Sequence, residues 1–239
     1  MAGPNGSGKS SILKEISNNY RTGPFINADE IEQALELDGR IDLQVKFQLS
    51  TDAASFRSFM KGNGRSWVAK AEGEGNKVSL SFSKGELRVG KTPSPYDAAL
   101  AADFIRHELL DRGYTFTFET VLSHKSKVDF LKDAKESGYK IYLYFICTTD
   151  PGINIQRIVQ RVKLGGHDVP REKVIKRYKE SLEILSAIIP LCHRVFLFDN
   201  SSDIRTVSPV AEIDKGNLII SNPEIPWWVD YYVIKKLYS

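Results

Sequence analysis

The first ten residues constrain the fold more than any other stretch of this 239-residue chain. They contain the pattern G-x-x-x-x-G-K-[ST], in which glycines let the backbone turn its N–H groups around the phosphates of a nucleotide. Such a loop opens a helix, and Ile12, Leu13 and Ile16 share one face of the helix expected after it. Lys9 can reach the β- and γ-phosphates, and the Ser10 hydroxyl can ligate Mg²⁺. The predicted nucleotide-binding residues are Gly3, Pro4, Asn5, Gly6, Ser7, Gly8, Lys9, Ser10 and Ser11.

A phosphate-binding loop normally follows a buried β-strand, and here only Met1 and Ala2 precede it. A parallel sheet without its central strand leaves buried backbone groups of the neighbouring strands unpaired, at a cost of about 1–3 kcal/mol each. We therefore expect Met1 and Ala2 to end that strand, and Met1 to be an internal methionine of a longer chain. The alternative is that the aromatic residues 231–234 fill the gap.

Composition sets broad limits on the class of protein. With 41% apolar and 26% charged residues, the chain has the balance of an ordinary globular protein. The net charge of +3 does not by itself indicate nucleic-acid binding. Cys147 and Cys192 lie in apolar runs, so we expect buried thiols in a reducing compartment, not a disulfide or metal site. The sequence shows no signal-peptide pattern and no apolar run of membrane-spanning length, and we expect a cytoplasmic location.

Strand and helix patterns alternate along most of the chain, which predicts an α/β fold. The predicted strands cover residues 24–27, 114–118, 140–147 and 195–198. The predicted helices cover residues 31–37, 96–112, 125–137, 153–164 and 171–189. Apolar strands that alternate with helices indicate a parallel sheet, here of the P-loop NTPase type with helices on both faces. An edge hairpin is expected at residues 210–213 and 218–220.

Residues 42–92 have a different pattern, and we expect them to be an insertion into a single domain that spans residues 1–239. Asp52 can cap a short helix over residues 53–60. Three strands are predicted at residues 66–72, 77–83 and 86–91, so the insertion reads as a small helix followed by a β-meander. The segment has no clustered carboxylates or histidines, and we expect no catalytic role for it.

Two acidic residues follow predicted strands, at the edge where parallel sheets bind ligands. Asp29 comes after the strand at residues 24–27, and Glu119 comes after the strand at residues 114–118. In phosphoryl transfer a carboxylate accepts the proton of the attacking hydroxyl, so both residues are candidates for this chemistry. Asp29 has an alternative role as the N-cap of the helix that begins there.

A basic stretch beyond residue 150 can supply cations to a transferring phosphoryl group. Its members are Arg157, Arg161, Lys163, His167, Arg171, Lys176 and Arg177. Arg157 and Arg161 are four residues apart, so a solvated helix face is the alternative for them. The alternative for His167 is that it is a loop residue without a role in binding or catalysis. The other histidines show no partner pattern and are expected to be structural or surface residues.

Missing motifs exclude several classes of P-loop protein. The chain has no LSGGQ-like signature of a transporter ATPase and no Asn-Lys-x-Asp motif of a GTPase. Residues 196–199 resemble a Walker B strand, but Asn200 stands where a hydrolytic ATPase would have glutamate. These absences leave phosphoryl transfer to a hydroxyl as the favoured reaction.

Together the motifs resemble the zeta toxin/UDP-N-acetylglucosamine kinase family of P-loop proteins. The resemblance is carried by AGPNGSGKS at residues 2–10, INADEI at 26–31, FETVLSH at 118–124, the segment 161–178 with its GGHDVP core, and FDNS at 198–201. It covers most of the chain apart from residues 42–92 and the last segment. GGHDVP differs from the corresponding part of the founding toxins, which leaves the substrate open.

The resemblance implies roles for individual residues. It makes Asp29 the general base, Lys9 a phosphate ligand and Arg161 a lid arginine at the γ-phosphate. Ser10 would ligate Mg²⁺. The residues implied to contact the acceptor are Glu119, Thr120 and His124. Further lid candidates are Arg157, His167, Arg171 and Arg177.

The implied function is ATP-dependent transfer of the γ-phosphate to a hydroxyl of a small molecule, with UDP-N-acetylglucosamine as a candidate acceptor. ATP and Mg²⁺ are the expected cofactors, and an antitoxin protein is a candidate partner. One alternative is a polynucleotide-end kinase, for which the only basic and aromatic candidates are Trp67, Lys70, Lys77 and Arg88. The other is a non-catalytic NTP-binding module of a toxin–antitoxin-type system. We expect no membrane partner.

Overall fold

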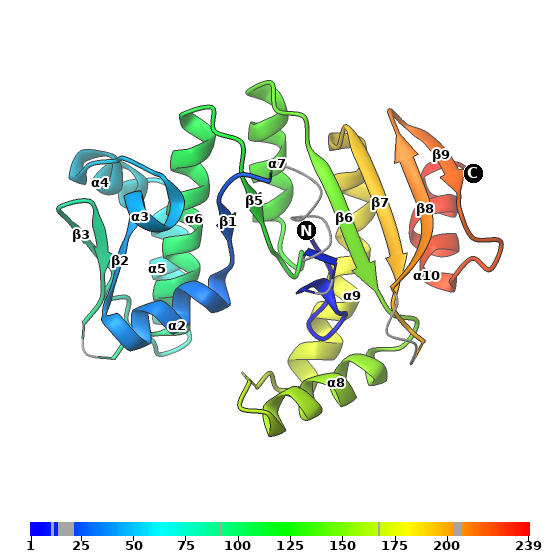
Figure 1. The fold of residues 1–239 in the computed structure, drawn as a ribbon, viewed down its shortest axis with the longest axis horizontal. Coiled ribbons are helices and arrows are strands. Elements are labelled where there is room, and N and C mark those ends of the chain that lie inside the picture. The colour runs from blue at the N-terminus through cyan, green and yellow to red at the C-terminus, as the bar shows by residue number, and fades with distance from the viewer. Residues whose placement is uncertain (11, 14–21, 91, 167, 203–206) are drawn as a thin grey trace. The chain divides into compact units, whose positions relative to one another are not determined.

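The structure is a computed structural model that describes residues 1–10, 12–13, 22–90, 92–166, 168–202 and 207–239 (Figure 1). Its chain forms two compact units: unit 1 comprises Met1–Tyr20 and Thr120–Ser239, and unit 2 comprises Arg21–Glu119. Ser11, His167 and residues 14–16 of the first predicted helix lie outside the described residues. Within the described ranges, no helix is both long and apolar enough to cross a lipid bilayer.

Unit 1 is built on a mixed sheet whose parallel part begins at the start of the chain. Strands β6 (Tyr142–Cys147) and β7 (Arg194–Asp199) pair in parallel, and β8 (Ser208–Asp214) and β9 (Asn217–Ile220) continue the sheet antiparallel. Ala2 forms parallel bridges to Phe145 on one side and to Thr120 on the other. The predicted parallel sheet and the predicted edge hairpin are both confirmed.

The backbone of Ala2 is paired on both sides, as expected for the end of a central strand. Its N–H donates to the Tyr144 carbonyl at 2.8 Å, and its carbonyl accepts from the Ile146 N–H at 2.9 Å. On the other side, the Thr120 N–H donates to the Met1 carbonyl at 3.0 Å. The alternative, in which residues 231–234 take the place of the central strand, is wrong, because this segment lies in the helical turn η2 (Asp230–Ile234).

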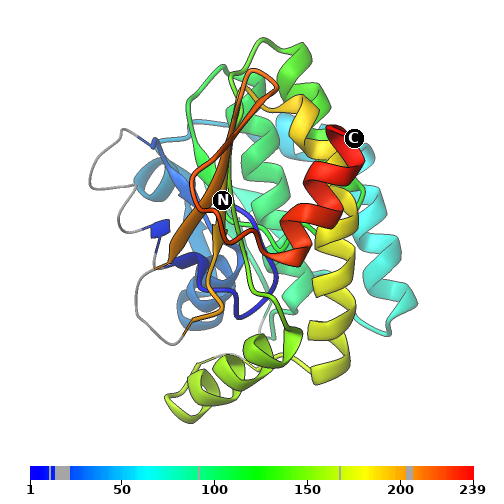
Figure 2. The same cartoon turned by 90° about the vertical axis from the view of Figure 1, so that its right-hand side faces the viewer.

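Helices cover one face of the unit 1 sheet, where α7 (Ser126–Glu136), α9 (Arg171–Ile188) and the C-terminal helical segment lie side by side (Figure 2). The C-terminal segment comprises α10 (Trp227–Val229), η2 and α11 (Lys235–Leu237), and a single turn, η1 (Ile189–Leu191), follows α9. Trp228 is fully buried, with its ring centroid 5.7 Å from that of Phe145 in β6. Helix α8 (Pro151–Lys163) follows β6 and packs against α9.

Unit 2 contains a second parallel pair and a buried helix. Strand β1 (Phe25–Ile26) pairs in parallel with β5 (Thr117–Phe118), and α2 (Ala28–Asp38) follows β1 directly. Helix α6 (Pro95–Asp111) begins at Ser94, which forms a capping box with Asp97. Helix α6 is buried along most of its length, and its Phe104 belongs to the same apolar core as Leu35 of α2. These helices match their predicted ranges closely.

The predicted meander is wrong in one strand. Residues 66–72 belong to a helix, α5 (Gly64–Gly73), which follows α4 (Ala53–Lys61). The antiparallel sheet has the order β2–β4–β3, formed by Arg40–Asp42, Glu86–Arg88 and Ser81–Ser83, so its third strand comes from the segment before α3 (Leu43–Phe47). Trp67 and Ala71 lie four residues apart in α5, and Trp67 packs against the core while Ala71 is buried. Helical burial of these residues therefore prevails over the β-propensity of Trp67 and Val68.

The segment 42–92 contributes directly to the core of unit 2, and substitution of Leu87 tests this. Leu87, in the middle strand β4, is 0% exposed and belongs to the same cluster as Leu35. We expect Leu87→Ala to lower the free energy of unfolding by about 2–5 kcal/mol, because it leaves a cavity. Leu37→Ala on α2, at a side chain that is 77% exposed, is the matched control and should change it by less than about 0.5 kcal/mol. Urea denaturation measures the free energy of unfolding, and an equal decrease in the two variants would contradict the placement of Leu87 in the core.

Candidate functional site

The predicted phosphate-binding loop emerges in unit 1 directly after the paired backbone of Ala2. Gly6 and Gly8 have φ angles of 75° and 92°, in the left-handed region that side chains disfavour. Lys9 and Ser10 already have helical geometry, and Ile12 is buried with Met1. The loop therefore opens a helix with an apolar inner face, as the motif predicts.

Lys9 is folded back into this loop. Its side chain is 7% exposed, and its Nζ donates to the carbonyl oxygens of Gly3 at 3.0 Å and Pro4 at 3.1 Å. The Ser7 hydroxyl is buried and has no hydrogen-bond partner among the described residues. A buried ammonium group and an unsatisfied buried hydroxyl are costly in an apolar setting, but both are suited to a bound anion.

Two asparagines that the sequence did not single out for this role contact the loop from other elements. Asn154 of α8 donates from Nδ2 to the Asn5 carbonyl at 2.6 Å. Asn200, directly after β7, donates from Nδ2 to the Ser7 carbonyl at 2.8 Å. Both contacts join residues far apart in the chain, so no local sequence pattern could have indicated them.

The basic candidates of α8 and α9 have different surroundings. Arg177 donates from Nη1 to Asn5 Oδ1 at 3.4 Å, so it contacts the loop. Arg157 donates from Nη2 to the Ser202 carbonyl at 3.4 Å. Arg161, in the last turn of α8, and Arg171, the first residue of α9, are exposed. Arg177 is thus a lid candidate that contacts the loop.

In unit 2, the side chains of Asn27 and Glu119 meet at the carboxyl ends of β1 and β5, and Asp29 lies in the first turn of α2. Asn27 is the N-cap of α2, and its Oδ1 accepts from the Asp29 N–H at 2.9 Å. Its Nδ2 donates to Glu119 Oε2 at 3.5 Å. The alternative role of Asp29 as the cap is therefore wrong, because Asn27 caps the helix. The Asp29 side chain is exposed in the first turn of α2, where its carboxylate is available for chemistry.

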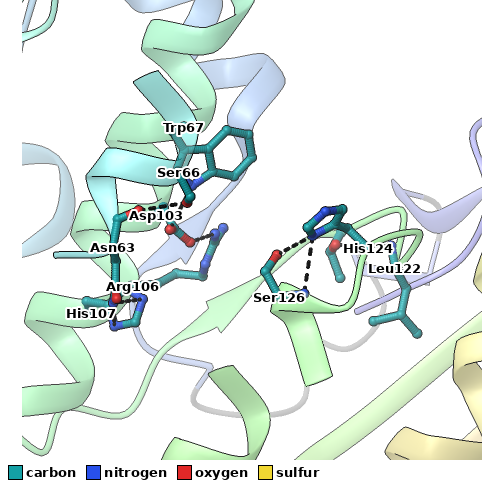
Figure 3. Close-up of polar contacts among 10 residues, drawn as sticks. Asn63, Ser66, Trp67, Asp103, Arg106, His107, Leu122, His124 and Ser126 are labelled. Carbon is teal, nitrogen blue, oxygen red and sulfur yellow. Dashed lines mark hydrogen bonds and ion pairs between the residues drawn. The ribbon is translucent and has the colours of Figure 1, made fainter. Parts of the chain in front are cut away.

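A buried ion pair supports the strand that leads to Glu119 (Figure 3). Arg106 in α6 pairs with Asp103, and the indole N–H of Trp67 donates to Asp103 Oδ2 at 2.9 Å. The Arg106 guanidinium lies 5.3 Å from the ring centroid of Phe118, the last residue of β5. Trp67 is thus part of a packed cluster, which does not suit it to stacking on a nucleic-acid base.

The other residues implied to contact an acceptor belong to unit 1. The Thr120 hydroxyl accepts from the Leu122 N–H at 3.1 Å. His124 is exposed, and its Nδ1 accepts from the Ser126 N–H at 3.2 Å and lies 2.9 Å from the Ser126 hydroxyl (Figure 3). His124 therefore helps to begin α7, and its exposed ring remains available to a ligand.

The thiols of unit 1 are protected by burial. Cys147 is 0% exposed, and burial raises the pKa of its thiol from 9.0 to about 12. Cys192 is half-buried, and burial also raises the pKa of its thiol to about 12. Burial likewise raises the pKa of the Tyr178 hydroxyl, which donates to the Thr148 carbonyl at 2.5 Å. The expectation of a buried thiol is confirmed for Cys147 and holds in part for Cys192.

We expect both thiols to be alkylated slowly by iodoacetamide at pH 8, because the thiolate is the reactive form and is scarce at this pH. Cys147 should react more slowly than Cys192, since its side chain is inaccessible as well. Mass spectrometry after timed alkylation measures both rates, and the same reaction in denaturant is the control. Rapid alkylation of native Cys147 would contradict its placement in β6.

Residues 96–206 match the model of the zeta toxin family. An uncharacterized protein of Haemophilus influenzae is 35% identical over 82 residues, which are 34% of this chain and 59% of that protein. The match thus spans about three fifths of this relative's length.

Solved structures with a similar chain trace include two AvrRxo1-ORF1:AvrRxo1-ORF2 complexes. The one with sulphate ions aligns over 91% of this chain and 67% of its own, at 18% identity and a TM-score of 0.47. The one with ATP aligns over 90% and 67%, at 17% identity and a TM-score of 0.46. A structure from the PezAT chromosomal toxin–antitoxin system of Streptococcus pneumoniae aligns over 87% and 70%, at 12% identity and a TM-score of 0.44. The family match confirms the resemblance that the motifs indicate: over residues 96–206 this chain is zeta-toxin-like.

Proposed function

We propose that this protein is a P-loop kinase that binds ATP through residues 3–10 and transfers its γ-phosphate to a hydroxyl of a small molecule. The observation that carries the proposal is the loop of unit 1. Gly6 and Gly8 take the left-handed conformations of an anion-binding turn, and the buried Lys9 ammonium lies within it. A helix begins at the end of the loop, and its N-terminus also favours a phosphate.

The loop also suits a magnesium ion that accompanies ATP. Mg²⁺ takes oxygen ligands, and in nucleotide sites it usually has one or two protein ligands beside phosphates and waters. The exposed Ser10 hydroxyl at the start of the helix fits this need. When bound, the ion would neutralise charge on the phosphates and help to orient them.

In the proposed reaction, the acceptor hydroxyl attacks the γ-phosphorus. A bond forms between the acceptor oxygen and phosphorus, and the bond from the γ-phosphorus to the oxygen that leaves with ADP breaks. Asp29 accepts the hydroxyl proton, and Glu119 orients the acceptor. Arg161 and Arg177 balance the charge of the transferring group. The lid roles of Arg157 and Arg171, and the acceptor roles of Thr120 and His124, belong to the same proposal.

UDP-N-acetylglucosamine is the acceptor that we propose first, on the basis of the zeta-toxin-like sequence. An antitoxin protein as partner rests on the same basis. We also propose a cytoplasmic location, in keeping with the free thiols of Cys147 and Cys192. The proposal of a polynucleotide-end kinase is weaker, because the Trp67 indole is engaged with Asp103 and packs against the core of unit 2. Stacking on bases requires an accessible aromatic face.

The test is incubation of the purified chain with ATP labelled in the γ-phosphate and separate pools of acceptors. We expect label in the sugar-nucleotide pool with the wild-type chain and much less label with Lys9→Ala. Label in oligonucleotide ends would favour the polynucleotide kinase. Tight ATP binding without transfer to any pool would favour the non-catalytic module.

A further inference from the structure

Two carbonyl groups of the phosphate-binding loop are held from outside the loop by asparagine side chains. Asn154 Nδ2 lies 2.6 Å from the Asn5 oxygen, and Asn200 Nδ2 lies 2.8 Å from the Ser7 oxygen. The two side chains belong to different elements, one to α8 and the other to the turn after β7. They hold alternate peptide groups of the same loop.

Peptide geometry gives these contacts a consequence for the ligand. A peptide group is planar, and in the trans form its C=O and the following N–H point in opposite directions. The described residues contain no cis peptide bond. A carbonyl fixed at Asn5 therefore directs the N–H of Gly6 to the opposite side, and a carbonyl fixed at Ser7 does the same for the N–H of Gly8. An anion-binding loop needs such N–H groups to stay in a fixed direction.

The same two asparagines also lie close to Gly6 and Gly8, where a side chain would meet them. A Cβ atom on Gly6 would lie 2.5 Å from the backbone oxygen of Asn154. On Gly8 it would lie 2.2 Å from Nδ2 of Asn200. At residue 6 the backbone of Asn154 leaves no room for a side chain. At residue 8 the contact is with the end of the Asn200 side chain, and the positive φ angle is the stronger requirement for glycine.

Both asparagines are themselves held in place. Asn154 is 0% exposed, and its Oδ1 accepts a hydrogen bond from the Thr148 hydroxyl. The Asn200 N–H donates to the Cys147 carbonyl at 2.8 Å. The preceding Asp199 accepts from the Trp228 indole N–H at 3.0 Å, which fixes the end of β7 to the buried C-terminal segment. The two contacts are therefore preorganised.

We propose that Asn154 and Asn200 are positioning residues that direct the Gly6 and Gly8 N–H groups toward the phosphates of the nucleotide. This inference rests on the proposed function for the identity of the ligand. Each asparagine acts through a different peptide group of the loop. Asn154 directs the N–H of Gly6, and Asn200 directs the N–H of Gly8. Loss of one side-chain donor should therefore release one glycine and leave the other in place.

The test uses the full chain with ¹⁵N-labelled glycine and follows the Gly6 and Gly8 amide signals during titration with ATP. We expect Asn200→Ala to reduce the ATP-induced shift of Gly8 and to spare that of Gly6, and Asn154→Ala to do the reverse. ATP affinity should fall about tenfold in each variant, the usual effect of one hydrogen bond. Asn217→Ala, at an exposed position of β9, is the control and should change neither signal.

Equal loss of both shifts in each variant, or unchanged shifts and affinity, would overturn the inference. Asn154→Asp and Asn200→Asp keep the side-chain shape and remove the same donor, so they replace any alanine variant that does not fold. Inorganic pyrophosphate is titrated in parallel. The glycine-specific pattern with pyrophosphate, but no binding or transfer of ATP, would support the positioning roles and count against the proposed kinase. A wild-type chain that binds neither would overturn both.

Discussion

Asp29→Asn should leave ATP affinity roughly unchanged and lower the rate of phosphoryl transfer by about 10²–10⁴-fold, the usual contribution of a general base. The carboxylate is exposed, and the cap of α2 is supplied by Asn27. The substitution therefore removes a proton acceptor and no structural contact of the helix terminus. It should also leave the melting temperature nearly unchanged.

The matched control for Asp29 is Glu30→Gln, which removes a carboxylate from the same helical turn. It should keep transfer near the wild-type rate. Asn27→Ala tests the cap itself and should lower the free energy of unfolding by about 0.5–2 kcal/mol. Full turnover in a folded Asp29→Asn protein would remove Asp29 from the mechanism and leave Glu119 as the next carboxylate to substitute.

Lys9→Ala should weaken ATP binding about 10- to 100-fold, because a charged hydrogen-bond donor contributes about 1.5–3 kcal/mol to a phosphate contact. The ammonium group contacts phosphates in the ground state as well as in the transition state, so affinity falls together with turnover. Calorimetric titration with ATP measures the loss directly. Asp29→Asn should thus lower only the rate of transfer, whereas Lys9→Ala should lower ATP affinity as well.

Lys9→Met is a second variant, because it keeps most of the buried side-chain volume while it removes the charge. Lys179→Ala, at an exposed position of α9, is the control for a general loss of positive charge. It should bind ATP as tightly as the wild type. Unchanged ATP affinity in a folded Lys9→Met protein would contradict the assignment of the loop.

Periodicity and caps predicted the long elements of the fold well. Ala98, Ile105 and Leu109 of α6 recur at helical spacing and are buried, and Gly39 ends α2 in a left-handed conformation. The error at residues 66–72 has a physical cause. Trp67 and Val68 favour a strand locally, but burial of Trp67 with Ala71 on one helical face outweighs that preference. The third strand, β2, is only three residues long and has a single buried residue, Ile41, so it shows no alternation.

The residues of the candidate site also differ in how well the sequence predicts them. The loop and the two carboxylates are found from sequence because each lies within a contiguous motif. Asn154 and Asn200 are not, because their partners in the loop are 149 and 193 residues away in the chain. The sequence shows Asn200 as a residue in place of glutamate and as part of FDNS, but neither feature indicates a contact with the loop. The cap of α2 is Asn27 and not Asp29, because the preference for Asn and Asp at helix caps does not choose between two such residues two positions apart.

The most direct test of phosphoryl transfer is the fate of the γ-phosphate in an extract of small molecules. The extract is incubated with labelled ATP, Mg²⁺ and either the wild-type chain or Asp29→Asn, and the products are identified by mass spectrometry. We predict that one hydroxyl-bearing metabolite gains the labelled phosphate with the wild-type chain, and that this product falls at least about 10²-fold with the variant. Label that appears in no metabolite, or equally with both proteins, would contradict the proposal.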